Sequence, residues 1–225
     1  MYQGKVGFRI FNTDRYPDKK KVEELSKYPT PNIADAMGRF RVMDPGMKCV
    51  TKGKVIAGPA LTVMARPGDN LMPHKAIEIA KPGDVIVINT CGNTNSAVWG
   101  ELMTYAATKQ GIAGLVVDGA VRDSKEINEI GFPVFARNVV ASGCDKDGPG
   151  EINCAISCGG VVVNPGDIVI ASEEGIVVVP LDDAEEVLNA TIAVHNRESA
   201  RIKEIEEGKV IKDDINTILR SKGVI

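Results

Sequence analysis

Two stretches of the sequence carry residues that could do chemistry together. The first runs from Trp99 to Met103, and the second, from Asp118 to Asp123, ends in an adjacent Arg122 and Asp123. A guanidinium is a planar fork of donors for a carboxylate, and a carboxylate is a hard oxygen ligand for a divalent cation. We therefore expect Glu101, Arg122 and Asp123 to hold a small 2-oxo acid against Mg²⁺.

The residues between these stretches predict the elements that position them. Leu102 to Gln110 reads as a helix, Gly111 is a typical helix stop, and Ala113 to Val117 is a continuous apolar run. Such a run is typical of a strand covered on both faces of a parallel sheet. A helix that leads into a parallel strand returns the chain to the sheet edge where ligands of α/β proteins bind. Arg122 and Asp123 are predicted at that edge.

Two of the acidic residues have alternative roles. Glu126 follows Asp123 by three positions, so the pair could cap a helix that runs to Ile130, and this role is compatible with a role in a site. Asp35 lies in a short predicted helix from Ile33 to Met37. There it could be a solvated or capping carboxylate, or part of a site.

The tail predicts one long helix, from about Asp182 to Glu207. Its apolar residues recur with the helical period as far as Ile205, and Glu198 falls inside that stripe. A buried carboxylate without a partner costs free energy. We therefore expect Glu198 either to meet a cation, metal-bound water or polar site, or to pair with Arg197 or Arg201 of its own helix.

Three copies of Pro-Gly-Asp punctuate the sequence, at 67–69, 82–84 and 165–167. Pro and Gly fit the two central positions of a type II turn. The second and third copies are predicted as turns that lead into buried strands. The first differs because Asn70 follows it and no clear strand does, so a ligand loop stays open there.

The remaining pattern consists of short elements. The sequence predicts a strand at 55–65, a helix at 74–80 and a small polar loop at 91–96. Residues 159–180 are predicted as three strands in an antiparallel meander. Residues 1–20 are polar and are predicted to be an extension that packs on a neighbour or frays.

Composition and charge limit the functions that the chain can have. Hydrophobic residues make up 44% and charged residues 25% of the 225, which is ordinary for one globular domain with appendages. The formal net charge of −3 and the 4% aromatic content offer neither a basic nor a stacking surface for nucleic acid. No secretion signal or bilayer-spanning run is evident. We expect a cytoplasmic protein without membrane or nucleic-acid partners.

The five cysteines lack a C-x-x-C pair and are predicted to be small buried hydrophobes rather than zinc ligands.

Several motifs together resemble the RraA-like family. They are the segments at 58–63, 67–70, 81–85, 114–123 and 161–167, and the likeness covers roughly residues 28–180. That family includes 4-hydroxy-4-methyl-2-oxoglutarate/4-carboxy-4-hydroxy-2-oxoadipate aldolases and the RraA regulators of ribonuclease E. The resemblance implies a layered α/β sandwich like the swivelling phosphohistidine domain, with mixed sheets. It also implies homotrimers or homohexamers with sites between subunits.

The resemblance divides the chain into three parts. Residues 1–27 are an N-terminal extension, and residues 28–180 are the RraA-like α/β domain. Residues 181–225 are a helical tail that packs on the same domain or on a neighbouring subunit.

The resemblance also implies roles for the residues of the site. Asp123 contacts Mg²⁺ or Mn²⁺, with waters filling most of the coordination shell, and Arg122 grips substrate oxygens. Gly100, Leu102 and Met103 form the helix start whose amides bind the pyruvyl carboxylate.

Four further residues complete the implied site. Asn70 lies near the bound carboxylate. Glu101 stands where the aldolases commonly carry Asp, so it has the same charge on a longer side chain. Asp35 and Glu198 match acids that a neighbouring subunit contributes.

The function implied by the resemblance is a metal-dependent, class II pyruvate aldolase. It would cleave 4-hydroxy-2-oxo acids such as 4-hydroxy-4-methyl-2-oxoglutarate, with oxaloacetate decarboxylation as a side activity, because both reactions leave a pyruvate enolate. The alternative is a non-catalytic RraA-type regulator that binds a ribonuclease or helicase. Acids around a metal favour the enzyme.

Overall fold

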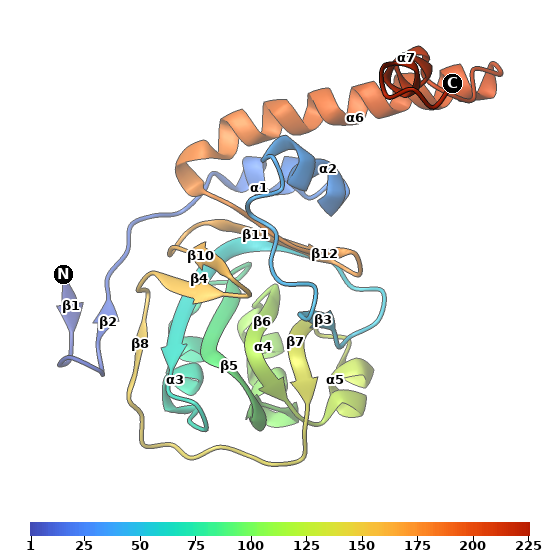
Figure 1. Cartoon of the computed structure of the whole chain (residues 1–225). Coiled ribbons are helices and arrows are strands. Elements are labelled where there is room, and N and C mark those ends of the chain that lie inside the picture. Colours follow the sequence, from blue (N-terminus) through green and yellow to red (C-terminus); the bar gives the residue numbers. More distant parts are fainter.

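The computed structural model describes all 225 residues, and its centre is a parallel sheet (Figure 1). Four adjacent strands run in the same direction: β4 (Ile56–Ala65), β5 (Val85–Trp99), β6 (Gly114–Val121) and β7 (Val134–Val139). Every residue of β6 is buried. The apolar run that predicted a strand covered on both faces is therefore confirmed, and the strand continues four residues further than predicted.

Short antiparallel strands extend this sheet at its edges. They are β1 (Tyr2–Gln3), β2 (Ile10–Phe11), β3 (Lys48–Cys49), β8 (Gly150–Ile152), β11 (Ile168–Ser172) and β12 (Gly175–Val179). One edge of β4 is shared, because its first half pairs with β11 and its second half with β8. β2 joins β8 in parallel. The sheet is therefore mixed, with ten strands in all.

Three helices cover one face of the parallel strands. They are α3 (Leu71–Ile79), α4 (Glu101–Gln110) and α5 (Ser124–Ile130). Met72, Met103 and Ile127 from these helices pack on the sheet in one hydrophobic cluster. Gly111 ends α4 with a φ of 77°, as its predicted role as a helix stop requires.

The opposite side of the fold is built from a hairpin and a second helical layer. A two-stranded sheet, β9 (Ile156–Cys158) and β10 (Val161–Val163), packs on the other face of the parallel strands. The β11–β12 ribbon is covered by α1 (Lys19–Leu25), α2 (Thr30–Ala36) and α6 (Ala184–Glu206), which follows a short 3₁₀ turn. A last helix, α7 (Asp213–Ser221), lies beyond the end of α6.

The mixed α/β class with a long C-terminal helix is confirmed, and several details of the prediction are wrong. The three-stranded meander does not form, because β10 pairs with β9 whereas β11 pairs with β12 and β4. The predicted loop at 91–96 is instead a bulged part of β5 that stays paired with β6. Hydrophobicity did not reveal either feature, because β9 is only three residues long and 91–96 is polar.

The N-terminal extension packs on its own domain. Arg9 donates two hydrogen bonds to Glu151 of β8, at 2.7 and 2.9 Å. Tyr16 donates a hydrogen bond to the buried carboxylate of Asp84 (3.3 Å), and Arg15 pairs with Asp182 at 3.0 Å. These contacts tie residues 1–20 to both flanks of the sheet.

The tail differs from the single predicted helix in two ways. The sequence did not predict α7, and the predicted apolar stripe of α6 is buried only in the first half of the helix, through Ala184, Val187, Thr191 and Val194. Ile202 and Ile205, further along the same stripe, are about half exposed, at 56% and 46%. No helix of the structure is both long and apolar enough to cross a membrane.

Candidate active site

A cavity of about 360 Å³ lies at the carboxyl ends of the parallel strands. Its wall is formed where β5 meets α4, where β6 ends, at the start of α3, and by the loop that precedes β8. The predicted residues that line it are Asn70, Gly100, Glu101, Leu102, Met103, Arg122 and Asp123. The structure therefore brings together every predicted site residue except Asp35 and Glu198.

Asp123 connects the two stretches that carry the chemistry. Its Oδ2 accepts a hydrogen bond from the backbone amide of Glu101, at 3.1 Å, and so satisfies the first donor of α4. Asp123 stands at the N-cap position of α5, but its side chain does not cap that helix. The predicted capping pair with Glu126 is therefore wrong, because the carboxylate turns toward α4. A left-handed backbone at Asp123, with φ 56°, accompanies this orientation.

Gly100 allows this close approach. A Cβ at this position would lie 2.6 Å from Oδ2 of Asp123 and 3.1 Å from Cγ of Arg122. No side chain fits at this distance without moving one of the two residues. The glycine before α4 is therefore required by packing, although its φ of −155° is open to any residue.

Arg122 lies beside Asp123 and keeps much of its guanidinium free. Its Nε is 3.4 Å from Oδ2 of Asp123, and the side chain is 48% exposed. Gly143, from the loop across the cavity, leaves room for the Nη1 end, since a Cβ there would lie 3.1 Å from it. The donors that do not face Asp123 remain available to an anionic ligand in the cavity.

The start of α4 supplies further donors. Asp123 takes up the amide of Glu101, and Thr104 is the first residue whose amide bonds back to the preceding turn, to the carbonyl of Gly100 at 3.1 Å. The amides of Leu102 and Met103 lie between them and have no turn of helix before them to bond to. Unpaired amides at a helix start, together with the helix dipole, favour a carboxylate.

Asn70 carries an unsatisfied atom in the cavity wall. Its Nδ2 donates to the carbonyl of Val98 at 3.3 Å, but its Oδ1 is buried and has no hydrogen-bond partner. A buried acceptor without a donor costs free energy, on the order of 1–3 kcal/mol. This acceptor is therefore placed for a ligand or water that brings a proton.

Asp69, the residue before Asn70, holds the cavity loop in place. Its carboxylate accepts backbone hydrogen bonds from Leu71, Asp147 and Gly148, at 2.9, 2.6 and 2.8 Å. Burial alone would raise the pKa of Asp69, but these three donors and the Arg66 guanidinium outweigh it and lower that pKa below its ordinary value. The loop that contains Asp147 and Gly148 is anchored by this carboxylate.

The donors around Asp123 fit a hard cation that keeps most of its waters. Oδ2 is occupied by the Glu101 amide and Arg122, whereas Oδ1 has no protein donor. No group of three or more His, Cys, Asp or Glu side chains is placed to hold a metal. Zinc would need such a cluster, whereas Mg²⁺ is commonly held by one or two carboxylates with waters and substrate oxygens. The free Oδ1 beside Glu101 and Asn70 matches the second kind of site.

Asp35 and Glu198 lie on the opposite side of the fold, in α2 and α6. Asp35 accepts a hydrogen bond from Nε of Arg39, at 2.7 Å, and Glu198 accepts one from Nδ2 of Asn32, at 2.6 Å. Glu198 is exposed, so its predicted burial is wrong. Of its predicted partners, Glu198 meets a polar group, the Asn32 amide, and forms no ion pair with Arg197 or Arg201, since Arg201 pairs with Glu204.

Sequence reasoning missed several residues of the cavity wall, three of which have titratable side chains. These three are His74 at the start of α3 and Cys144 and Lys146 of the anchored loop. Burial raises the pKa of the Cys144 thiol, so it is held in its neutral form. The loop follows β7, and its position after a parallel strand was a signal that it borders the same edge.

The carboxyl ends of parallel strands are where open α/β folds usually bind their ligands, and the cavity lies at that position. The comparisons with known proteins are more specific. The family model described as RraA-like (Aldolase/RraA) matches residues 30–178. The chain belongs to the RraA-like family.

Relatives and solved structures agree with this assignment. A Halalkalibacterium halodurans protein named "Putative 4-hydroxy-4-methyl-2-oxoglutarate aldolase" is 36% identical over 186 residues, which cover 83% of this chain and 89% of that protein. An uncharacterized Pseudomonas syringae protein superposes with a TM-score of 0.78 at 27% identity, covering 88% of this chain and 94% of that one. Streptomyces coelicolor RraAS2, described as an unusual member of the RNase ES inhibitor RraA family, gives 0.75 at 25% identity, covering 83% and 99%.

Proposed function

We propose that the protein is a divalent-metal-dependent, class II pyruvate aldolase that cleaves 4-hydroxy-2-oxo acids such as 4-hydroxy-4-methyl-2-oxoglutarate. Oxaloacetate decarboxylation is the expected side activity. The observation that carries the proposal is the cavity in which Arg122, Asp123 and the first amides of α4 converge. The aldolase names of several relatives give independent support.

The cleavage leaves a pyruvate enolate, and the cavity offers donors for each of its anionic groups. The amides of Leu102 and Met103 bind the carboxylate, because they open a helix and have no turn before them. Arg122 holds the developing oxyanion with the donors of its planar guanidinium. Mg²⁺ or Mn²⁺, held through Oδ1 of Asp123, would supply a Lewis acid for the same charge.

Removal of the 4-hydroxyl proton requires a base near the other end of the substrate. Glu101 is the acid of the cavity wall whose carboxylate no hydrogen bond within the chain occupies. Its side chain is half-buried where the cavity opens toward a groove between α4 and α5. We assign Glu101 the role of relaying that proton. Its side chain is longer than the Asp that the aldolases commonly carry at this position.

The proposal includes a homotrimer or homohexamer with the site at a subunit interface. Asp35 and Glu198 are remote from the cavity of their own chain but both are exposed, so a neighbouring copy can present them to it. Leu102, at the mouth of the cavity, is 80% exposed in the single chain. The proposal also includes a fold of the swivelling phosphohistidine type of sandwich and a cytoplasmic location for the protein.

The alternative is a non-catalytic regulator that binds a ribonuclease or helicase. It is supported by the likeness to Streptomyces coelicolor RraAS2 and to an RNA-processing inhibitor, RraA, from Thermus thermophilis, which gives a TM-score of 0.63 at 28% identity and covers 68% of this chain. The free Oδ1 of Asp123 and the unsatisfied Oδ1 of Asn70 favour the enzyme, because a binding scaffold has no use for either.

The test is pyruvate release by the purified full-length protein. With Mg²⁺ and either 4-hydroxy-4-methyl-2-oxoglutarate or oxaloacetate, we expect turnover that EDTA abolishes and added Mg²⁺ or Mn²⁺ restores. A panel of 4-hydroxy-2-oxo acids would then identify the preferred substrate. Pyruvate release at the uncatalysed rate across the whole panel would refute the aldolase and favour the regulator.

A further inference from the structure

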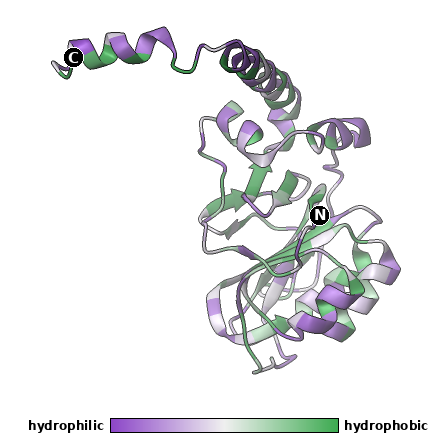
Figure 2. Ribbon diagram, turned by 90° about the vertical axis from the view of Figure 1, so that its right-hand side faces the viewer, coloured by the Kyte–Doolittle hydropathy of each residue, from purple (hydrophilic) through white to green (hydrophobic).

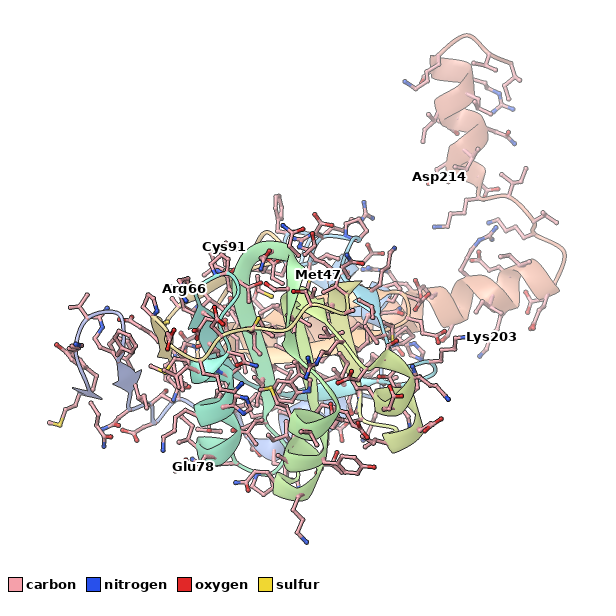
Figure 3. The ribbon with its side chains drawn as sticks, turned by 90° about the horizontal axis from the view of Figure 1, so that it is seen from below. Met47, Arg66, Glu78, Cys91, Lys203 and Asp214 are labelled. Carbon is pink, nitrogen blue, oxygen red and sulfur yellow. The ribbon has the colours of Figure 1, made fainter.

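The C-terminal arm, defined here as residues 202–225, is unlike the rest of the surface. Nearly half of the large apolar side chains that are exposed in the chain lie in it. None of the residues of α7 is buried. The arm begins in the distal part of α6, a helix about 35 Å long that extends past the body, so α7 lies far from the sheet (Figures 1 and 3). Lys203 and Asp214 mark its course in Figure 3.

The apolar residues of α7 form one stripe. Ile215, Ile218 and Leu219 recur at the spacing of one helix face, and the exposed Ile211 and Ile225 lie just outside the two ends of the helix. The ribbon of this helix correspondingly carries both apolar and polar residues in Figure 2. Ile215 and Ile218 are 43% and 47% exposed. A nine-residue helix is only marginally stable alone in water, so this stripe needs a surface to cover it.

The charges beside the stripe indicate what that surface is. Asp214 precedes the apolar residues and Lys222 follows them, and neither forms an ion pair within the chain, whereas the adjacent Asp213 pairs with Lys209 at 2.8 Å. Residues 214 and 222 are about 12 Å apart along one helix, so they do not reach each other within it. An acid at one end and a base at the other are complementary to a second, antiparallel copy of the same helix.

The register of such a pair follows from the sequence. In an antiparallel arrangement centred on Ile218, position 214 faces position 222. Asp214 of each copy then meets Lys222 of the other. The same patch is used on both chains, as two-fold symmetry requires. We propose that α7 is a pairing element that joins two copies of this chain through antiparallel contact of their α7 helices.

The first experiment measures the mass of the full-length protein in solution by light scattering after size exclusion. Ile218→Glu places a charge at the centre of the contact, and we expect the particle mass to fall twofold. Thr217→Glu adds the same charge on the polar face of the same helix and should leave the mass unchanged. An odd number of chains in the parent particle, or an unchanged mass for Ile218→Glu, would overturn the pairing.

The second experiment tests the register. Its positive results, a cross-link and a restored pair, cannot arise from a variant that fails to fold. Ile218→Cys should form a disulfide-linked dimer on mild oxidation, because position 218 lies at the two-fold axis, whereas Thr217→Cys should not exceed the background of the native cysteines. Asp214→Lys should weaken the pair, and Asp214→Lys combined with Lys222→Asp should restore it. If Ile218→Glu halves the mass but Ile218→Cys does not cross-link, α7 docks elsewhere on the second copy and the helix pairing is refuted.

Discussion

The two edges of the parallel sheet use aspartate in different ways. At the amino edge, Asp84 and Asp167 close the second and third Pro-Gly-Asp turns. Each is 1% exposed and accepts a hydrogen bond from the amide three residues earlier, of Lys81 and Asn164, both at 2.8 Å. Each also receives a donor from a distant segment. These carboxylates therefore stabilise the turns by accepting hydrogen bonds from backbone amides.

At the carboxyl edge the work is divided between two aspartates. Asp69 is 1% exposed and accepts hydrogen bonds from three amides, two in the loop of the cavity wall and one at the start of α3. Asp123, which lines the cavity, is 35% exposed on its side chain and bonds a single amide, so one of its oxygens has no donor within the chain. The comparison separates an acid that builds the cavity from an acid that is free to act in it.

This difference shows why the same residue type needs its surroundings before a role can be assigned. A carboxylate that is fully hydrogen-bonded by amides stabilises a turn and has no oxygen left for a cation. A carboxylate that keeps one oxygen free at a cavity, beside a guanidinium, can bind one. Removing each acid in turn should therefore affect different properties.

The largest effect is expected at Arg122 and Asp123, the pair that lines the cavity. Arg122→Ala and Asp123→Ala should each lower kcat for pyruvate release by about 10²–10³-fold, because they remove charge stabilisation of the enolate. The urea midpoint should stay close to that of the parent, since both side chains are substantially exposed. Steady-state kinetics and equilibrium unfolding measure the two properties separately.

A matched control exists at the opposite edge. Arg15 and Asp182 form another Arg–Asp pair, with 3.0 Å between the charged atoms and both side chains exposed. Arg15→Ala and Asp182→Ala should leave kcat within about twofold of the parent, because exposed ion pairs contribute little. If both cavity variants were as active as these controls, the assignment of Arg122 and Asp123 would be wrong.

The second effect is on stability, at the acid that builds the cavity. Asp69→Asn keeps the shape of the side chain but turns an NH₂ group toward amide donors, so we expect the free energy of unfolding to fall by about 3 kcal/mol. The pKa of Asp69 is lowered in the folded state, so its contribution is present above the unfolded pKa of about 4 and is lost as the pH falls through the folded pKa.

Urea unfolding at a series of pH values tests this directly. The parent should lose stability below about pH 4, and Asp69→Asn should lose less over the same range because it has no carboxylate to protonate. Asp14→Asn, at an exposed acid of the N-terminal extension without an ion pair, is the control and should follow the parent. Identical pH profiles for Asp69→Asn and the parent would contradict the role given to its three amide bonds.

Much of the fold followed from the sequence because its signals are local. The apolar run of β6, the stop at Gly111 and the Pro-Gly-Asp turns each depend on a few neighbouring residues, and the structure has all of them. The clustering of Glu101, Arg122 and Asp123 also followed, since consecutive parallel strands end at one edge. Local signals therefore sufficed for the main elements and for the centre of the site.

The remaining features depend on contacts between distant residues. The pairing of β9 with β10 and the turn of Asp123 toward α4 are set by tertiary packing, which periodicity does not encode. Glu198 was predicted to be buried because it lies within an apolar stripe, but it is exposed and meets only Asn32 of α2, and the next residues of the stripe, Ile202 and Ile205, are exposed as well. A helical period indicates which face is apolar but not whether anything covers it.

A third prediction concerns the close contact between Gly100, before α4, and Asp123, after β6. Gly100→Ala places a methyl group 2.6 Å from the original position of Asp123 Oδ2, so the carboxylate must move. We expect kcat to fall by about 10–100-fold, because a displacement of this size misaligns reacting groups. Gly143→Ala would meet only the flexible end of Arg122, at 3.1 Å, and should cost less. Equal losses for both variants would show that crowding of Arg122, and not the position of Asp123, limits the reaction.

The smallest effect is expected at the amino edge, and it has the opposite dependence on pH. Burial raises the pKa of Asp84, although the Lys81 amide and Tyr16 hydroxyl partly offset it. An acid whose folded pKa is raised contributes stability that is complete below its unfolded pKa and is lost as the pH rises through the folded pKa. Asp84→Asn removes this loss and keeps an acceptor for the Lys81 amide, so its stability at pH 7 should change by under about 1 kcal/mol.

Urea midpoints of Asp84→Asn and the parent between pH 3 and pH 7 measure this effect. The difference between them should shift in favour of the variant as the pH rises, whereas for Asp69→Asn it should shift in favour of the parent. Tyr16→Phe, which removes one donor to Asp84, should raise the folded pKa further and enlarge the loss of stability on the alkaline side. The same sign of pH dependence for Asp84→Asn and Asp69→Asn would show that the two edges do not treat their buried carboxylates differently.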